Sequence, residues 1–239
     1  NNALKFVKSK FFFVMSAGDT YNLNINKWCE EIFKSKENIG MICGNIKINY
    51  PSNNKIISRN LPFEKNILLN KTHLINMAKK RNVTFFGGGV MMNTNYVINL
   101  GGYSEELEWI ADWYLYLILG MKYKFICLNK VFATLKVREG DYSKSLFNWK
   151  KNKIVLKNFL SIINSDKTEK ILLLKFFKKH SIIPIYDFRM LSLLFYDKNF
   201  RNFCSLLLFW RIISYKLGKY LSYLVPCKYH NVVRTIFRI

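Results

Sequence analysis

The chain has 239 residues, of which 50% are hydrophobic and 16% aromatic, so it is long enough to bury a substantial core and its composition excludes an intrinsically disordered protein. It carries 38 Lys and Arg against 15 Asp and Glu, and this formal net charge of +23 favours an anionic partner: nucleic acid, an anionic membrane or a phosphorylated substrate. Many Asn and Ile residues accompany the lysines, and AT-rich coding produces the same mixture.

The first part of the chain predicts two strands separated by a helix. Residues 11–15 form a short apolar run that ends at the small residues and aspartate of 16–19, a pattern typical of a buried strand followed by a loop. Residues 24–36 carry apolar side chains at helical spacing and predict a helix. Residues 41–48 predict a second strand, and the Pro, Ser and Asn cluster at 50–54 predicts a turn.

Glycines interrupt the next part of the chain. Residues 72–80 predict a short helix, whereas residues 83–93 are apolar but contain three consecutive glycines at 87–89. Such a run lets the backbone bend sharply, as in a bulge, or approach another group closely. The glycine pair at 101–102 predicts a further turn.

A helix and two strands follow. Residues 112–119 predict a helix, with Asp112 at its N-cap and Gly120 at its C-cap. Residues 123–128 and 131–137 predict two strands. Because strands and helices alternate, this part of the chain predicts an α/β domain.

The cysteines and the apolar stretches limit the class of protein further. Five cysteines are scattered without a CxxC or Cys/His spacing, so neither a disulfide framework nor a zinc site is predicted, and reduced thiols in a cytoplasmic setting are expected. No stretch reaches the roughly 18 uninterrupted apolar residues of a spanning helix. The chain starts at Asn1 without a methionine, and we expect it to be a fragment whose beginning is missing.

The remainder, residues 146–239, has a different character and predicts a basic amphipathic helical extension. Residues 151–239 contain 17 Lys and Arg against 4 Asp and Glu, and apolar stripes with cationic flanks predict helices near 170–179, 186–196 and 203–223. Such helices can pack on the α/β domain, lie on an anionic membrane surface, or bind single-stranded nucleic acid. Nucleic acid ranks last because no RNA- or DNA-binding motif accompanies the charge. We expect that part of the extension packs and part contacts the membrane.

Two groups of motifs over residues 1–145 resemble the family-2 glycosyltransferases. The first group is similar to the stretch that leads to the DxD-type motif of this family, and it comprises Asn1-x-Ala3-Leu4, Phe11-Phe12 and Ser16-Ala17-Gly18-Asp19. The second group is similar to the GG(F/Y)xE segment, the ED motif and the strand after it, and it comprises Gly101-Gly102-Tyr103-x-Glu105, Ala111-Asp112-Trp113 and Gly120-x-Lys122-Tyr123. Both the order and the spacing fit.

The resemblance implies a GT-A-like (Rossmann-related) mixed sheet flanked by helices, with the catalytic domain in residues 1–145 and the helical extension in 146–239. The first nucleotide-binding strand would precede Asn1. Ala111 stands where the family often has glutamate, and Ser16 and Gly18 stand where it often has acids. These variants resemble the subgroup that builds lipopolysaccharide, capsule or other surface glycans. The implied partners are a nucleotide-sugar donor and a glycan or lipid-linked acceptor, at the inner face of the membrane.

The resemblance also implies roles for particular side chains. Asp19 would hold Mg²⁺ or Mn²⁺, which neutralises the diphosphate as it leaves; a turn aspartate at the end of a strand is the structural alternative. Asp112 would be the general base, with a pKa raised by the aromatic residues around it; a helix N-cap is compatible with that role. The alternative function, in which neither aspartate has a catalytic role, is that of a non-catalytic basic membrane- or nucleic-acid-binding module, such as a decayed transferase.

Further residues are candidates for contacts with the two substrates. Ser16, Gly18 and Arg138 are the predicted donor and diphosphate contacts, although a surface cation is the ordinary role of an arginine. The predicted acceptor-side residues are Gly87, Gly88, Gly89, Glu105 and Trp113. A bulge at the glycines, and a glutamate that balances nearby lysines, are the structural alternatives.

Overall fold

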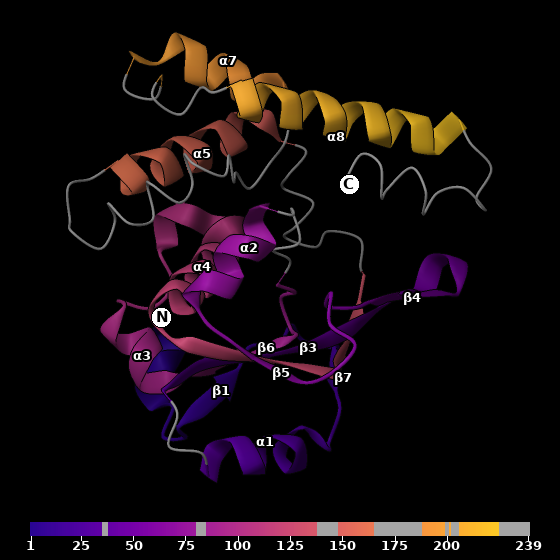
Figure 1. Cartoon of the computed structure of the whole chain (residues 1–239), viewed down its shortest axis with the longest axis vertical. Helices are drawn as coiled ribbons and strands as arrows, with labels where there is room; N and C mark the ends of the chain where they lie inside the picture. The colour runs from indigo at the N-terminus through magenta and orange to yellow at the C-terminus, as the bar shows by residue number, and fades with distance from the viewer. Residues whose placement is uncertain are drawn as a thin grey trace. The chain divides into compact units, whose positions relative to one another are not determined.

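A computed structural model describes residues 1–34, 38–79, 85–137, 148–164, 188–198, 201 and 206–224. The chain divides into two compact units, Asn1–Val155 and Leu156–Ile239 (Figure 1). The domain boundary predicted at residue 145 falls within 138–147, outside the described residues.

Unit 1 is built on a mixed sheet of seven strands. The strands are β1 (Phe11–Phe13), β2 (Thr20–Tyr21), β3 (Ile39–Tyr50), β4 (Lys55–Arg59), β5 (Ile67–Leu69), β6 (Val90–Asn93) and β7 (Lys124–Lys136). They follow the order β1-β6-β3-β7-β2, with β4 paired to β3 and β5 paired to β7. The two long central strands β3 and β7 run parallel, whereas β1 and β6 are antiparallel to their neighbours. Chain segments far apart in sequence therefore meet along β3.

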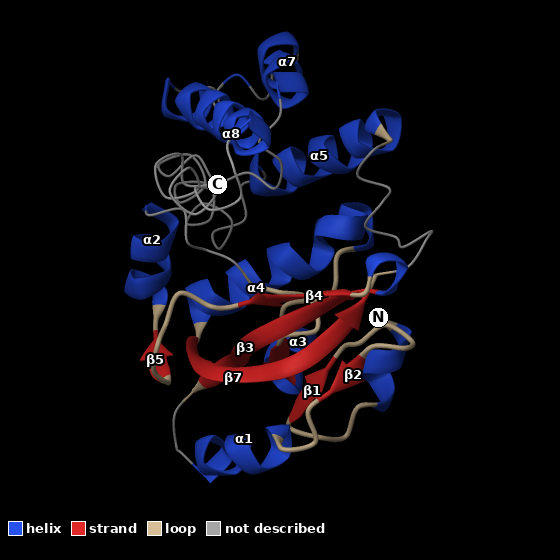
Figure 2. Cartoon of the chain, turned by 90° about the vertical axis from the view of Figure 1, so that its right-hand side faces the viewer, coloured by secondary structure: helices blue, strands red, loops and turns tan. Residues whose placement is uncertain are grey.

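Helices cover both faces of this sheet (Figure 2). The α-helices of unit 1 are α1 (Ile25–Lys34), α2 (Lys71–Lys79), α3 (Thr94–Asn99) and α4 (Ala111–Lys122), and the 3-10 helices are η1 (Asn2–Phe6), η2 (Pro51–Asn53) and η3 (Glu105–Ile110). Helix α1 lies on one face, and α4 lies on the other with α2 beside it. The predicted α/β fold with a mixed sheet between helices is confirmed.

The two faces of β3 explain this layering. Ile42 points to the α1 side and packs with Ile25 and Cys29 in one buried cluster. Met41, the preceding residue, points to the α4 side, because successive side chains of a strand alternate between its faces. A Cβ on Gly120 would lie 3.2 Å from the Met41 Cε, so Gly120 lets α4 sit directly on the sheet. Both faces of β3 are therefore buried.

The structure corrects several local predictions. Helix α4 continues to Lys122, so Gly120 is a buried packing position and not the C-cap. Asp112 lies inside the first turn, because Ile110 is the N-cap residue of this helix. Strand β1 is half-buried, whereas a buried strand was predicted, since it lies at the end of the sheet order beside β6.

The two strands predicted on either side of Asn129 are one strand, β7. The polar residues at this point do not form a turn because other segments hold Asn129 in the sheet. Its side chain accepts a hydrogen bond from Asn45 Nδ2 at 2.9 Å and donates one to the backbone oxygen of Glu64 at 2.7 Å. Asn45 lies at a register shift between β3 and β7, so the interruption is absorbed as an irregularity in strand pairing.

Unit 2 is helical where it is described. Its helices are α7 (Phe188–Tyr196) and α8 (Leu206–Leu224), together with the end of α5 (Trp149–Asn164), which begins in unit 1. Each helix contributes buried apolar side chains: Leu156, Phe159, Leu160, Ile163, Leu191, Leu193, Leu194, Leu208 and Ile212. The helices predicted near 186–196 and 203–223 are confirmed, and the one near 170–179 lies outside the described residues.

Three of the five cysteines lie among the described residues. Cys29, Cys43 and Cys127 are free and buried, while Cys204 and Cys227 lie outside the described residues. Burial raises the pKa of the Cys29 thiol to about 11. In the part of the chain that the structure describes, no helix is both long and apolar enough to cross a bilayer.

Candidate functional site

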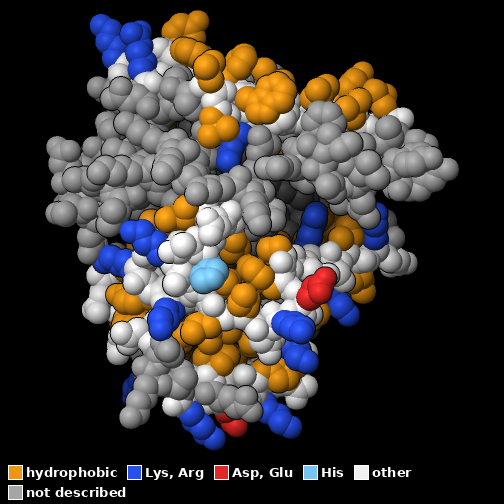
Figure 3. Space-filling model, viewed as in Figure 1, with side chains coloured by type: hydrophobic (Ala, Val, Ile, Leu, Met, Phe, Trp, Pro, Cys, Tyr) orange, Lys and Arg blue, Asp and Glu red, His pale blue; other side chains and the backbone are white. Residues whose placement is uncertain are grey.

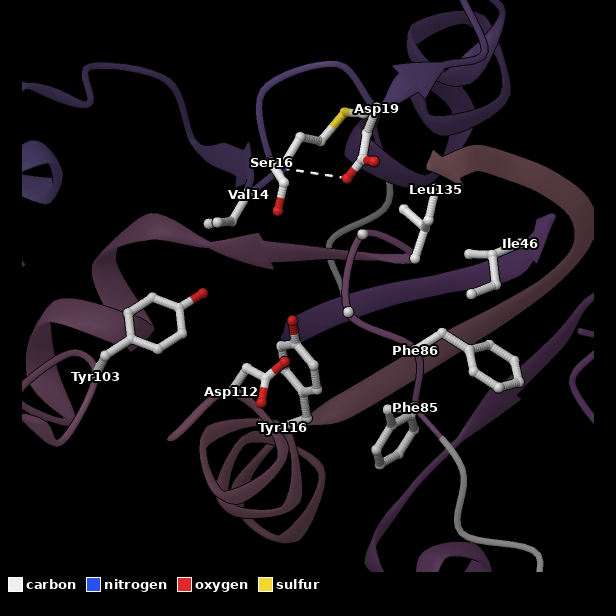
Figure 4. A pocket seen from close by; sticks show the side chains of 13 residues that line it. Val14, Ser16, Asp19, Ile46, Phe85, Phe86, Tyr103, Asp112, Tyr116 and Leu135 are labelled. Atoms are coloured by element: carbon white, nitrogen blue, oxygen red, sulfur yellow. Dashed lines mark hydrogen bonds between the residues drawn. The ribbon is translucent and has the colours of Figure 1, made fainter. Parts of the chain in front are cut away.

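A pocket of about 460 Å³ opens in unit 1 at one end of the sheet (Figure 4). Its walls come from the segment after β1, the glycine run before β6, the turn before η3 and the start of α4. Asp19 and Asp112 both line it, and Figure 4 shows them on opposite sides of the view. This volume is within the range of about 300–1,000 Å³ that is usual for small-molecule sites.

Asp19 closes a tight turn and ties it to β7. The backbone N–H of Asp19 donates to the Ser16 oxygen at 3.1 Å, and Gly18 has φ +85°, as in a type II turn. The Asp19 carboxylate in turn accepts the Ser16 N–H on Oδ2 at 3.3 Å and the Lys136 N–H on Oδ1 at 2.8 Å. The aspartate predicted at the strand end therefore has the structural role of a turn residue while it lines the pocket.

Asp112 lies on the opposite wall, in the first turn of α4. Burial raises the pKa of the Asp112 carboxyl above its ordinary value, and the Trp113 N–H, which donates to Oδ1 at 2.6 Å, offsets this shift in part. A helix N-terminus also favours a negative charge. A half-buried carboxylate with a raised pKa is well suited to accept a proton from a hydroxyl group near neutral pH.

Two tyrosine hydroxyls lie near Asp112. Burial, and then the negative charge of Asp112, raise the pKa values of Tyr103 and Tyr116. Both phenols therefore stay protonated at neutral pH and keep a hydrogen to donate. Both residues line the pocket, and in Figure 4 the Tyr116 ring lies directly beside the Asp112 carboxylate.

The first residue of the chain holds the segment that carries Tyr103. Asn1 Nδ2 donates to the Tyr103 backbone oxygen at 2.7 Å, and the Tyr103 N–H donates to Asn1 Oδ1 at 2.8 Å. Gly102 has φ +74°, and a Cβ there would lie 2.6 Å from Asn1 Oδ1. The glycine pair predicted as a turn thus fits against Asn1 and directs Tyr103 to the pocket.

The run of three glycines forms a turn that passes over the pocket. The Gly89 N–H donates to the Phe86 oxygen at 2.8 Å, and Gly88 has φ +73°. A Cβ on Gly87 would lie 3.1 Å from Asp112 Oδ2, and one on Gly89 would lie 3.0 Å from the Gly44 oxygen. Close approach of the backbone, one of the two predicted roles of this run, is therefore observed.

An apolar wall completes the pocket. It consists of Ile46, Phe85, Phe86 and Leu135, with Val14 and Met15 next to the Asp19 turn. The buried Phe85 ring packs in T-shaped contacts with two other rings, Tyr116 at 6.3 Å and Phe125 at 5.8 Å between centroids. Phe85 thereby fixes the ring that lies beside Asp112. One polar end and one apolar wall suit a ligand with a charged or hydroxyl-bearing part and a flat apolar face.

The predicted site residues fall into three groups. Asp19, Ser16, Asp112, Gly87 and Gly88 line the pocket together. The residues that do not line it are Gly18, Gly89, Glu105 and Trp113, although Gly18 and Gly89 belong to turns that do. Arg138 lies outside the described residues.

Sequence reasoning assigned no role to Tyr103, Phe85 or Phe86, and it placed Tyr116 only among the aromatic residues that desolvate Asp112; all four line the pocket. Tyr116 follows Asp112 by one helical turn, a spacing that places both on one face of α4 and could have identified it. Phe85 and Phe86 directly precede the glycine run, but their sequence context is that of ordinary core residues.

Asp19 can hold a hard cation only as a single carboxylate ligand. Among the described residues, no group of three or more His, Cys, Asp or Glu side chains is placed to hold a metal ion. Each Asp19 oxygen already accepts one backbone hydrogen bond and has further lone pairs. Mg²⁺ commonly binds through one or two carboxylates, substrate phosphates and water, so this donor set fits a cation shared with a diphosphate.

No protein-family model and no curated protein matches the sequence. Among solved structures, the chain is similar to the crystal structure of residues 1–349 of TarS from S. aureus, a glycosyltransferase, with a TM-score of 0.51 and 14% identity. The match covers 93% of this chain and 58% of that chain, so the chain spans less than two thirds of the TarS chain. At this identity the likeness concerns the fold alone, and it confirms the predicted GT-A-like architecture.

Proposed function

We propose that the chain belongs to an inverting, metal-dependent glycosyltransferase of family 2. It moves a sugar from a nucleotide-sugar donor to a glycan or lipid-linked acceptor in the synthesis of a surface polysaccharide such as lipopolysaccharide or capsule. The main support is that Asp19 and Asp112, which are far apart in sequence, line one pocket of a GT-A-like fold. The similarity of the fold to that of a glycosyltransferase supports the general class.

In this proposal Asp112 is the general base. Its carboxylate takes the proton of an acceptor hydroxyl while that oxygen attacks the anomeric carbon, and the bond to the diphosphate breaks on the opposite side of the sugar. The raised pKa of Asp112 brings its basicity closer to neutral pH. A correctly placed general base contributes about 10²–10⁴-fold to the rate.

Asp19 is the residue proposed to hold Mg²⁺ or Mn²⁺ with the donor diphosphate. The cation would neutralise negative charge on the leaving group. The hydrogen bonds from Ser16 and Lys136 fix the direction of the Asp19 carboxylate, which lowers the entropy cost of binding. Ser16, in the same turn and on the pocket wall, is proposed as a donor contact.

The remaining pocket residues would position the acceptor. The Gly87 backbone passes close to Asp112 Oδ2 and leaves space for a hydroxyl group there. Phe85 and Phe86 present ring surface in the same pocket, and sugars commonly lie against such surfaces through their C–H faces. The helical extension would keep the enzyme at the inner face of the membrane as a peripheral protein, close to a lipid-linked acceptor.

A ligand screen on the full-length protein tests this proposal. Thermal unfolding is followed with a panel of sugar nucleotides, with Mn²⁺ present and with EDTA in its place. A donor that binds the native state raises the Tm by mass action, and the rise should need the cation. No rise with any nucleotide would contradict a transferase and favour a non-catalytic basic module.

A further inference from the structure

Helix α8 of unit 2 has an exposed apolar stripe in addition to its buried one. The stripe consists of Leu206, Trp210, Leu217, Tyr220 and Leu224. At 100° per residue these five positions fall within an arc of about 80° on the helix. Leu206 is 89% exposed, and Trp210 and Leu224 are each 63% exposed. We call this set the α8 stripe.

The α8 stripe is not needed for the core of unit 2. Leu208 and Ile212 lie on the opposite side of α8 and are 1% and 0% exposed, so the helix already has a buried face. The outer face of such a helix is ordinarily polar. Figure 3 shows hydrophobic side chains gathered over α7 and α8 in the upper part of the view. A contiguous exposed apolar surface of this kind marks an interaction site.

Unit 2 exposes further aromatic residues and carries cations outside the stripe. At the end of α7, Phe195 and Tyr196 are 56% and 88% exposed, and Arg201 Nε donates to the Phe195 backbone oxygen at 3.2 Å. Lys216 precedes Leu217 by one residue and lies about 100° around the helix from it. In the described part of unit 2 the single carboxylate is that of Asp197, which pairs with Lys157 at 3.3 Å.

We propose that the α8 stripe is a docking surface for an anionic lipid bilayer, on which α8 lies parallel to the membrane plane. The inference rests on the proposed peripheral location and makes it specific. Leucines enter the acyl boundary, Trp210 and Tyr220 lie at headgroup depth, and the cations face anionic headgroups. Among the described helices none can span a bilayer, so the contact is interfacial.

The chemistry of the stripe favours lipid over the two other possible occupants. Nucleic acid would be bound by cations with stacking rings, and Leu206, Leu217 and Leu224 offer neither. A second copy of the chain would bring like charge together, because residues 151–239 carry 17 Lys and Arg against 4 Asp and Glu. An anionic bilayer matches both the apolar stripe and the positive charge.

Vesicle flotation of the full-length protein tests the proposal. The vesicles contain 30% phosphatidylglycerol in phosphatidylcholine, and pure phosphatidylcholine vesicles are the comparison. The Leu206→Gln/Trp210→Gln/Leu217→Gln variant should lose on the order of tenfold or more in partitioning to anionic vesicles. A matched control is Leu23→Gln/Ile56→Gln/Ile98→Gln, which changes three exposed apolar residues of unit 1 and should bind as the wild type does.

Additional measurements separate the outcomes. Trp210→Phe should bind vesicles but lose most of the blue shift in fluorescence that binding produces. Equal vesicle binding by the stripe variant and the wild type would overturn the proposal. The proposal would also be overturned if the stripe variant still bound vesicles and lost only self-association, measured by light scattering, or only binding to single-stranded DNA. The rise in Tm with a sugar nucleotide, measured on the same variants, reports separately on the proposed transferase.

Discussion

Gly87 and Asp112 approach so closely that a Cβ on the glycine would lie 3.1 Å from the carboxylate Oδ2. The contact joins the turn before β6 to the first turn of α4, two segments that the sequence does not associate. It leaves one side of the carboxylate open to the pocket. Any side chain at position 87 would occupy space beside this carboxylate, where we propose that the acceptor hydroxyl binds.

Gly87→Ala is expected to reduce transfer strongly while the fold persists. The new methyl group displaces either the carboxylate or the acceptor, and a misplacement of about 1 Å can reduce the rate by about 10²-fold. The measurement is kcat together with the Tm. Asn54→Ala is the control: φ is +49° there and the residue does not line the pocket, so strain should lower the Tm and leave transfer intact. Equal kcat for Gly87→Ala and the wild type would exclude a role for this space.

Asp112→Asn should abolish transfer but preserve donor binding. The amide has the shape of the carboxylate and its Oδ1 still accepts the Trp113 N–H, but it cannot act as a base. We expect kcat to fall by about 10²–10⁴-fold, with a similar rise in Tm on donor binding in both proteins. Retained turnover in the variant would remove Asp112 from the reaction.

The same substitution should stabilise the protein, increasingly so as the pH rises. The folded-state pKa of Asp112 is raised above its unfolded value, mainly by burial. Its contribution to stability is therefore complete below about pH 4 and is lost as the pH rises through the folded pKa. The Tm of Asp112→Asn minus that of the wild type should grow between pH 4 and pH 8. A constant difference would mean that the carboxyl is not desolvated in solution.

Two substitutions at Asp19 should separate its structural role from metal binding. Asp19→Ala removes the acceptor of both the Ser16 and Lys136 N–H groups and should cost about 1–2 kcal/mol, seen in urea unfolding. Asp19→Asn retains one acceptor oxygen and should cost less. Both should lose the Mn²⁺-dependent part of the Tm rise with a sugar nucleotide. If Asp19→Asn keeps that part, the cation is held elsewhere.

Asn1→Ala in the full-length protein should loosen the turn that carries Tyr103. Two hydrogen bonds between the Asn1 side chain and the Tyr103 backbone are lost, at a cost of about 0.5–1.5 kcal/mol each at most, because this segment is exposed. Hydrogen exchange at the Tyr103 amide should become faster. Asn24→Ala, which removes a surface amide of unit 1, should leave that amide unchanged.

Much of the fold could be predicted from local patterns. Helices α1 and α2 could be predicted from the spacing of their apolar residues, and the turns around β6 from their glycines. These features arise from interactions between residues that are close in sequence. Asp19 became a candidate because small residues and a turn surround it, and Asp112 because Ala111-Asp112-Trp113 resembles a family motif. Prediction was wrong where distant segments decided the outcome: Asn129 remains in β7 because Asn45 and the backbone of Glu64 bind it, and Gly120 remains helical because Met41 packs against it.

The sequence alone determined the alternation of strands and helices and the excess of positive charge in the second part of the chain. These are properties of neighbouring residues, whose periodicity and charge need no knowledge of distant contacts. The tertiary structure decided that Asp19, Asp112, Tyr103 and Phe85 share one pocket, because parallel pairing of β3 with β7 brings their segments to the same end of the sheet. It also decided which face of α8 is buried, since only packing against other parts of the chain covers one of its two apolar sides and leaves the other exposed.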